Sequence, residues 1–286
     1  MSEPPAAEPP ASSPPAVCYR HPERTTRLSC SACGNPICVE CTHRASVGQL
    51  CPDCVAERGN QTTYTREDLG PGATRRRSPA TVTLVVVNVA IFLVGVLVAP
   101  VGNLLFGLGA QHNPSVADGQ VWRLATSMFL HAGIPHILFN MYALWLFGGQ
   151  LEREVGTKSF LSLYAASGLA GGSLFYLLNL ASPQPAVGAS GAIFGLFGAW
   201  LVAAYRNRHS PGGRAGLQQL LLLLGINLAL PLFIPNIAWE AHLGGLVAGG
   251  LVTALWTTGD LRRHPGRRVL IGVAVALAAV AAVVGM

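Results

Sequence analysis

The sequence of 286 residues predicts an all-α membrane protein that is preceded by a small separate domain. Hydrophobic residues make up 51% of the chain and charged residues only 11%, whereas a typical soluble domain has about 25% charged residues. Apolar segments recur after residue 80, while all seven cysteines lie between residues 18 and 54. The formal charge of +6 is therefore interpreted loop by loop, as a signal of membrane topology and not of nucleic-acid binding.

The first residues, 1–17, are expected to form a disordered proline-rich tail. The stretch MSEPPAAEPPASSPPA contains six prolines, two glutamates and no basic residue. Such a composition is typical of disorder. A secretory signal peptide would have a basic start followed by an apolar run, so none is expected here.

Residues 18–54 contain four pairs of metal-ligand residues, and two residues separate the members of each pair. The pairs are Cys18/His21, Cys30/Cys33, Cys38/Cys41 and Cys51/Cys54. Two intervening residues allow a tight turn to direct both side chains at one ion, and zinc binds four thiolate or imidazole ligands in a tetrahedron. The pairs therefore predict two structural Zn2+ sites in which every cysteine is used once.

Other interpretations of this segment stay open. A disulfide framework is one, although the two-residue gaps and a reducing cytoplasm favour metal. A rubredoxin-like iron site is another, and His43 competes with Cys54 as the eighth ligand. Because neither four-ligand site keeps an open position, a structural or adaptor role is expected and not catalysis.

The order and spacing of the pairs resemble a B-box-type zinc finger. That resemblance implies a cross-brace, in which the first and third pairs share one ion and the second and fourth pairs share the other. So small a domain is expected to need metal in order to fold. It could recruit a cytoplasmic protein partner, respond to metal or oxidation, or stabilise the N-terminus.

Residues 55–80 are expected to be a basic linker, because they are polar and end in Arg75, Arg76 and Arg77. Seven apolar segments follow, near residues 81–99, 136–151, 158–180, 190–205, 216–234, 241–258 and 269–285. Several are shorter than the ~20 residues that span a bilayer, so neighbouring protein is expected to shield them. The 33 glycines are typical of tight helix packing.

Basic residues predict the orientation, because Lys and Arg concentrate in cytoplasmic loops. With the N-terminus inside, 18 of the 19 basic residues lie on the inner side, and only Arg123 lies outside. The small domain is then cytoplasmic, residues 259–286 supply an inner loop and an additional transmembrane helix, and the C-terminus is outside. The excess of Arg over Lys suggests a GC-rich bacterial genome and hence a plasma-membrane protein.

The long outer loop, residues 100–135, is too apolar for a free loop. It contains the stretch VGNLLFGLGA as well as Trp122 and Arg123. An element lying in the outer membrane interface would account for these features, and an ordinary extracellular loop is the alternative.

Three apolar segments carry a potentially reactive group near their outer ends, namely Ser190, His242 and His136. Each lies 16 to 18 residues from the first charged residue at the inner end, which is ~24 to ~27 Å along a helix. Asn140 follows His136 by one turn on the same face. Ionisable groups in a membrane are costly and usually face the protein interior or an aqueous cavity, so their matched depth predicts one polar site.

These residue types suit acyl transfer. A serine hydroxyl needs a neutral imidazole to accept its proton, as His242 could. The oxyanion needs preset donors, which His136, Asn140 and the Ser190 amide could supply. Glu240 is two residues from His242 and points elsewhere on a helix, so a Ser–His dyad is expected and not a triad.

The surroundings of Ser190 fit this chemistry, although a lone Gly-x-Ser-Gly motif is weak. Gly188, Ala189 and Gly191 would let a substrate backbone approach, and Phe194 could pack against the imidazole. Helix packing alone is one alternative, since small residues serve it too. A transporter or channel is another, but it would need polar groups that continue to the inner face, where these segments are almost purely apolar.

At these residues the sequence resembles the rhomboid family of intramembrane serine proteases. The matching stretches are WR (122–123), HAGIPHILFN (131–140), LEREVG (151–156), GASGAIFGL (188–196) and AHLGGLVAGG (241–250). The resemblance covers residues 81–258 and implies a six-helix core, to which the seventh apolar segment is an addition seen in some members.

The resemblance implies Ser190 as nucleophile, His242 as general base, and His136 with Asn140 in the oxyanion hole, with no cofactor for catalysis. The substrate would be a transmembrane protein cut near the outer face. The alternative is a catalytically inactive rhomboid-like protein that binds membrane helices. Phe194 stands where some members have tyrosine, so stacking is kept and a hydroxyl is lost.

The resemblance also implies supporting roles for residues outside the site. Trp122 and Arg123 would belong to an outer loop in the bilayer leaflet. Glu152 and Arg153 would brace an inner loop through hydrogen bonds. Two further residues, Gly245 and Gly249, would pack the sixth helix against the fourth.

Overall fold

The computed structural model describes residues 16–44, 49–57, 78–209, 211–258 and 265–285. Residues 1–76 and 77–286 form two compact units, and each is described by itself. The expected tail up to residue 15, most of the expected linker with Arg75 to Arg77, and residues 259–264 of the expected inner loop lie outside the described residues.

The first unit is built from short strands and turns around its cysteines. Its elements are β1 (Ala16–Val17), β2 (Thr25–Thr26), the 3-10 turn η1 (Val39–Cys41), β3 (His43–Arg44), β4 (Gln49–Leu50) and α1 (Pro52–Glu57). β1 pairs with β2, and β3 with β4, both antiparallel. Five of the seven buried core residues are cysteines, and the others are Ile37 and Leu50. An apolar core of this size is too small to stabilise a fold alone.

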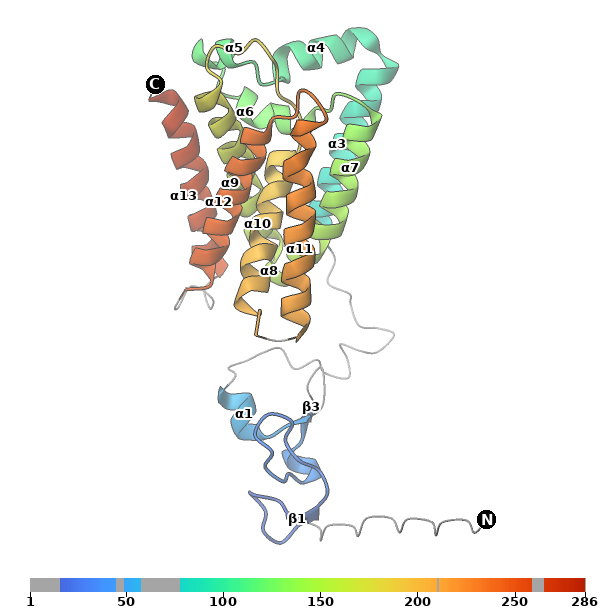
Figure 1. The fold of residues 1–286 in the computed structure, drawn as a ribbon, viewed down its shortest axis with the longest axis vertical. Coiled ribbons are helices and arrows are strands. Elements are labelled where there is room, and N and C mark those ends of the chain that lie inside the picture. The colour runs from blue at the N-terminus through green and yellow to red at the C-terminus, as the bar shows by residue number, and fades with distance from the viewer. Residues whose placement is uncertain (1–15, 45–48, 58–77, 210, 259–264, 286) are drawn as a thin grey trace, which may run out of the picture. The chain divides into compact units, whose positions relative to one another are not determined.

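The second unit is a bundle of helices, with α4 crossing one end (Figure 1). Its elements are α3 (Pro79–Leu97), α4 (Ala99–Gly109), α5 (Asn113–Ala117), α6 (Arg123–Thr126), η2 (Ser127–Phe129), α7 (Ile134–Ala143), the π-helical turn η3 (Leu144–Gly148), α8 (Gly149–Val155), α9 (Thr157–Leu178), α10 (Ser190–Arg206), α11 (Pro211–Ala229), η4 (Leu230–Leu232), α12 (Trp239–Trp256) and α13 (Pro265–Val284).

Among the described residues, four helices are long and apolar enough to cross a membrane, which indicates a multi-pass membrane protein. They cover Pro79–Leu97, Thr157–Leu178, Gly212–Leu232 and Gly266–Val284. Two other elements of the bundle are shorter, as expected for several segments: α7 has 10 residues and α10 has 17. The total of seven spans stays a prediction.

Burial separates the inner helices from the outer ones. Of the membrane-spanning window of α9, 56% is buried within the protein, whereas none of the α11 window is buried. Large apolar side chains of α11, such as Leu221, Leu222 and Ile226, are exposed. In a bilayer this surface faces lipid, which is as apolar as leucine.

Glycines allow α9, α10 and α12 to approach at backbone distance. A Cβ atom added to Gly245 would collide with the carbonyl oxygen of Gly191, and one added to Gly249 would collide with that of Gly195. Small residues at such contacts let membrane helices pack closely. The start of α12 is thereby held against the start of α10.

A buried carboxylate holds the start of α3. Glu152 of α8 is 1% exposed and accepts hydrogen bonds from the backbone amides of Ala80 and Thr81 at 3.0 and 2.8 Å. The hydroxyls of Thr81 and Thr157 each donate to it at 2.8 Å. An anion at a helix N-terminus satisfies free N–H groups and favours the helix dipole, so Glu152 joins α8 to α3 and α9.

We predict that Gly249→Ala destabilises the bundle, because its new methyl group meets the Gly195 backbone. Overpacking of this kind lowers the free energy of unfolding by about 1–3 kcal/mol. The thermal midpoint then falls by on the order of 5 °C. Gly250→Ala is the matched control, since the nearest atom to an added Cβ there is 3.8 Å away. Thermal unfolding in detergent measures both variants, and equal midpoints would contradict this account of the helix contact.

Candidate active site

Ser190 occupies the first position of α10, where the preceding loop turns sharply into the helix. Gly188 has φ +127°, a conformation that side chains other than glycine rarely adopt. Its amide donates to the Ser127 carbonyl oxygen at 2.9 Å, which fastens the loop to η2. Ser190 is therefore presented at a helix N-terminus by a fixed turn.

His242 meets this serine from the first turn of α12. Its Nε2 atom lies 2.9 Å from Ser190 Oγ, a hydrogen-bond distance. The ring of Phe194, one turn after Ser190, stacks on the imidazole with a centroid distance of 4.2 Å and an angle of 8° between planes. The stacking fixes the ring in the orientation that points Nε2 at the hydroxyl.

The other nitrogen of His242 lacks a carboxylate partner. Among the described residues, His242 Nδ1 is buried and has no hydrogen-bond partner. Glu240 instead accepts a hydrogen bond at 3.0 Å from Asn179 Nδ2, so it points elsewhere. The geometry is that of a serine–histidine pair without a third member.

His136 lies beside the loop that carries Ser190. A Cβ atom added to Gly188 would stand 2.7 Å from His136 Nε2, so only glycine allows this approach. His136 Nδ1 accepts from the Ala132 amide at 3.4 Å, which leaves the ring proton on Nε2. His136 can thus offer an N–H donor next to the free amides at the start of α10.

Asn140 lies on α7, the same helix as His136. It is buried one turn after His136, but its Nδ2 donates to the His136 carbonyl oxygen at 2.8 Å. Its Oδ1 has no partner among the described residues. The bond to the His136 carbonyl oxygen uses one of the two N–H bonds of the Asn140 amide, so a second donor remains, and its role as an oxyanion donor stays a prediction.

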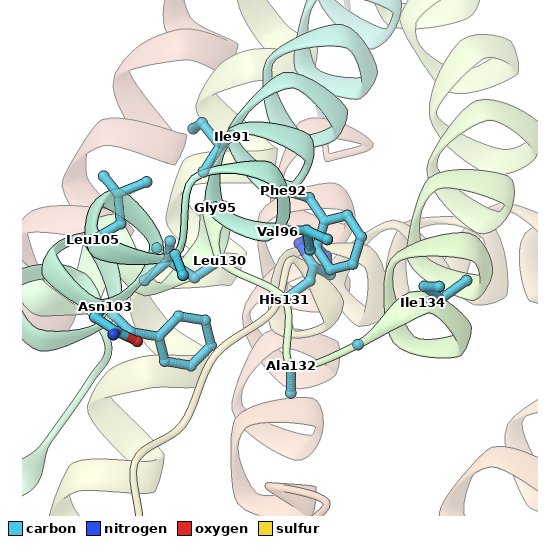
Figure 2. A pocket seen from close by; sticks show the side chains of 14 residues that line it. Ile91, Phe92, Gly95, Val96, Asn103, Leu105, Leu130, His131, Ala132 and Ile134 are labelled. Carbon is cyan, nitrogen blue, oxygen red and sulfur yellow. The ribbon is translucent and has the colours of Figure 1, made fainter.

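His131 is a neighbour of the site that the sequence analysis did not single out. It is 4% exposed, and neither ring nitrogen has a partner among the described residues. Its ring meets that of His136 edge-on at 5.0 Å. It lines a cavity of about 380 Å³, and Figure 2 shows it beside Phe92 and Val96. Its place at the start of the HAGIPHILFN stretch was the available signal.

The loop of residues 100–135 is structured by Arg123, which is 5% exposed. Its guanidinium donates to the carbonyl oxygens of Ala110 and Gly107 at 2.7 and 2.8 Å. A cation at the C-terminus of α4 satisfies the free carbonyls and favours the helix dipole. Trp122 Nε1 adds a bond to the Leu108 carbonyl oxygen at 3.3 Å.

In the first unit the cysteines and one histidine gather into two groups that could each hold a metal ion. One group contains Cys18, His21, Cys38 and Cys41, and the other contains Cys30, Cys33, Cys51 and Cys54. In each group the ligand atoms lie within 4.8 Å of one another, and His43 is in neither. All seven cysteines are free thiols, which does not fit the disulfide interpretation.

The distances suit a tetrahedral ion. His21 Nδ1 lies 3.8, 3.4 and 3.3 Å from the sulfurs of Cys18, Cys38 and Cys41. The edge of a tetrahedron with metal–sulfur bonds of about 2.3 Å is about 3.8 Å, and an edge to nitrogen is slightly shorter. The first and third pairs therefore converge on one point.

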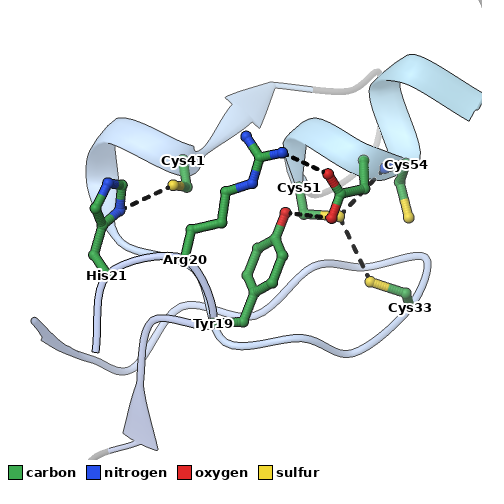
Figure 3. A network of polar contacts seen from close by, with 8 residues as sticks. Tyr19, Arg20, His21, Cys33, Cys41, Cys51 and Cys54 are labelled. Carbon is green, nitrogen blue, oxygen red and sulfur yellow. Dashed lines mark hydrogen bonds and ion pairs between the residues drawn. The ribbon is translucent and has the colours of Figure 1, made fainter.

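Backbone amides and a polar bridge support the second group. The amides of Cys51 and Cys54 donate to the sulfurs of Cys30 and Cys51 at 3.2 and 3.3 Å. Burial raises the pKa of the Cys30 thiol, but backbone N–H donors outweigh it and bring the pKa to about 6. Tyr19 and Arg20 both bind Asp53 at 2.8 Å (Figure 3), which joins the turn of the first group to the helix of the second.

Comparison with known proteins places the second unit in a family. Residues 118–260 match the rhomboid domain. The chain is 39% identical to the rhomboid protease GluP of Bacillus subtilis over 52% of this chain and 29% of that protein. It is 39% identical to YdcA of the same organism over 54% of this chain and 76% of that protein.

A more distant relative is the rhomboid-like protease 1 of Toxoplasma gondii, which is 34% identical over 55% of this chain and 54% of that protein. The chain thus spans only part of the length of several relatives, and the match lies in the helical unit that carries Ser190 and His242. The chain belongs to the rhomboid family.

Proposed function

We propose that this protein is an intramembrane serine endopeptidase that cleaves transmembrane proteins near the outer membrane face. The observation that carries the proposal is the 2.9 Å contact between Ser190 Oγ and His242 Nε2 at the N-terminus of a helix in an apolar bundle. GluP and the Toxoplasma relative are both named as proteases.

The first step is attack on the peptide carbonyl. His242 Nε2 accepts the serine proton as Oγ bonds to the carbonyl carbon, so the imidazole becomes an imidazolium and the carbonyl oxygen an oxyanion. The Ser190 amide and His136 Nε2–H are the donors nearest this position, and the positive end of the α10 dipole adds to their effect. Asn140 can join them through the second N–H bond of its amide or after a change of rotamer.

The second step releases the products. The His242 imidazolium gives its proton to the leaving amine as the peptide C–N bond breaks, and an acyl-enzyme remains. Water then attacks the ester carbon while His242 accepts its proton, and His242 returns that proton to Ser190 Oγ as the C–Oγ bond breaks and the carboxylic acid product leaves. An intact substrate helix hides its carbonyls in hydrogen bonds, so small or helix-destabilising residues are expected near the cut.

The orientation and domain boundaries belong to the same proposal. The distribution of basic residues supports a cytoplasmic N-terminus, an outer C-terminus and a plasma-membrane location. Ser190 then lies toward the outer face, and Arg206 marks the inner end of α10. The proposed core covers residues 81–258, and α13 is an additional span.

We further propose that residues 18–54 form a B-box-type zinc-binding domain with two structural Zn2+ ions. The support is the convergence of four ligands at each group in the cross-braced arrangement. Zinc would supply the cross-links that its apolar core is too small to replace. The thiolate and imidazole donors match the preference of zinc.

We predict that the parent protein cleaves a transmembrane substrate in proteoliposomes. Ser190→Ala and His242→Ala should each lower the rate by at least about 10³-fold, and His136→Ala by about 10²–10³-fold through loss of an oxyanion donor. His112→Ala, a histidine bonded to Ser115 in the outer loop, is the control and should stay within about twofold.

Product peptides identified by mass spectrometry locate the cut. If the folded parent co-purifies with the substrate helix but leaves it intact, the inactive rhomboid-like alternative holds and the protease proposal is wrong.

We predict two zinc ions per chain by elemental analysis of the purified protein. Cys18→Ser and Cys33→Ser should each remove about one ion, because each breaks a different group. His43→Gln should keep both ions, since His43 is in neither group. A protein without zinc after expression in zinc-supplemented medium, or loss of an ion in His43→Gln, would contradict the assignment.

A further inference from the structure

We propose that the groove between α10, α11 and α12, at the end of the bundle away from Ser190, binds one anionic phospholipid. The phosphate would lie on Arg206 and Arg208, and an acyl chain would follow the groove between the helices. This site is separate from the proposed protease chemistry, because α10 places its two ends ~24 Å apart.

The groove is a substantial cavity of about 750 Å³. Its floor is the last part of α10, including Tyr205, and its walls are Leu217 and Leu221 of α11 and Ala254 of α12. Both α11 and α12 pack on α10, so the groove lies where they diverge. Leu221 is 52% exposed on the lipid-facing helix α11, which makes the groove continuous with the lipid-facing surface.

Two arginines give the mouth of the groove its charge. The Arg208 guanidinium lies 4.1 Å from the centre of the Tyr205 ring and donates to the Tyr205 carbonyl oxygen at 2.9 Å. Arg206 is exposed at the end of α10. Within the described ranges, neither arginine forms an ion pair with an acidic side chain. Guanidinium groups bind phosphate oxygens through paired hydrogen bonds.

The helix ends do not cancel this charge. The C-termini of α10 and α12 contribute roughly −0.5 each and the N-terminus of α11 roughly +0.5, so with two arginines the local charge is roughly +1.5. Free phosphate would use the charge alone, whereas the leucine walls need an apolar chain. Basic pockets between transmembrane helices suit anionic headgroups, and the proposed orientation puts this one at the cytoplasmic leaflet, which carries such lipids.

The test measures lipid binding to the full chain by native mass spectrometry in detergent, on a Ser190→Ala background so that catalysis plays no part. Phosphatidylglycerol is the probe, and phosphatidylcholine with the same acyl chains is the comparison. We expect at least tenfold tighter binding of phosphatidylglycerol, and a loss of at least tenfold in the double variant Arg206→Gln/Arg208→Gln.

The charge-matched control is Lys158→Gln/Arg267→Gln, which removes two exposed basic side chains outside the groove and should change binding less than twofold. Leu217→Trp fills the groove without altering charge and should reduce phosphatidylglycerol binding as much as the arginine variant. If Arg206→Gln/Arg208→Gln fails to fold, the result for Leu217→Trp tests the proposal instead.

The proposal is overturned if both lipids bind equally or if the control loses as much as the groove variant. Displacement of the lipid by inorganic phosphate would mean a simple anion site and would also overturn it. None of these results depends on protease activity, so this proposal and the proposed function fail separately.

Discussion

Backbone contact between α10 and α12 is the constraint on which the rest of the structure depends. Ser190 begins α10 and His242 lies in the first turn of α12, so the separation of the two helices sets the distance between their side chains. Helices with ordinary side chains at their contact lie about 8–10 Å apart. The glycines at 245 and 249 allow a closer approach, and the 2.9 Å contact between Oγ and Nε2 follows from it.

Charged side chains at helix ends hold the surrounding elements in place. Glu152 binds the N-terminus of α3, and Arg123 binds the C-terminus of α4, each with the sign that the helix dipole favours. Both side chains are almost fully buried, which a charge tolerates only with such partners. Together they fix α3 and the outer loop around the helices that carry the reactive pair.

The sequence predicted helix positions well where an apolar segment is long and a charged residue marks its end. The segment expected at 190–205 is α10, Ser190–Arg206, and the apolar segment 100–135 does contain a defined element, α4, whose place at the outer interface stays a prediction. The rotamer of Asn140 could not be foreseen, because its amide can donate to the His136 carbonyl oxygen as well as toward an oxyanion. The groove at Arg206 and Arg208 depends on how α10, α11 and α12 diverge, and no sequence pattern encodes that. Spacing alone also left open which cysteine pairs share an ion, although the B-box resemblance implied the grouping seen.

The most direct test of the central claim asks whether Ser190 is an activated nucleophile. Detergent-purified protein is treated with a fluorophosphonate probe, and the labelled residue is identified by mass spectrometry. The account predicts labelling at Ser190 in the parent and none in His242→Ala, because the hydroxyl needs the imidazole to take its proton. An unlabelled parent with a normal thermal midpoint and full zinc content would contradict the account and leave Ser190 as a helix-packing residue.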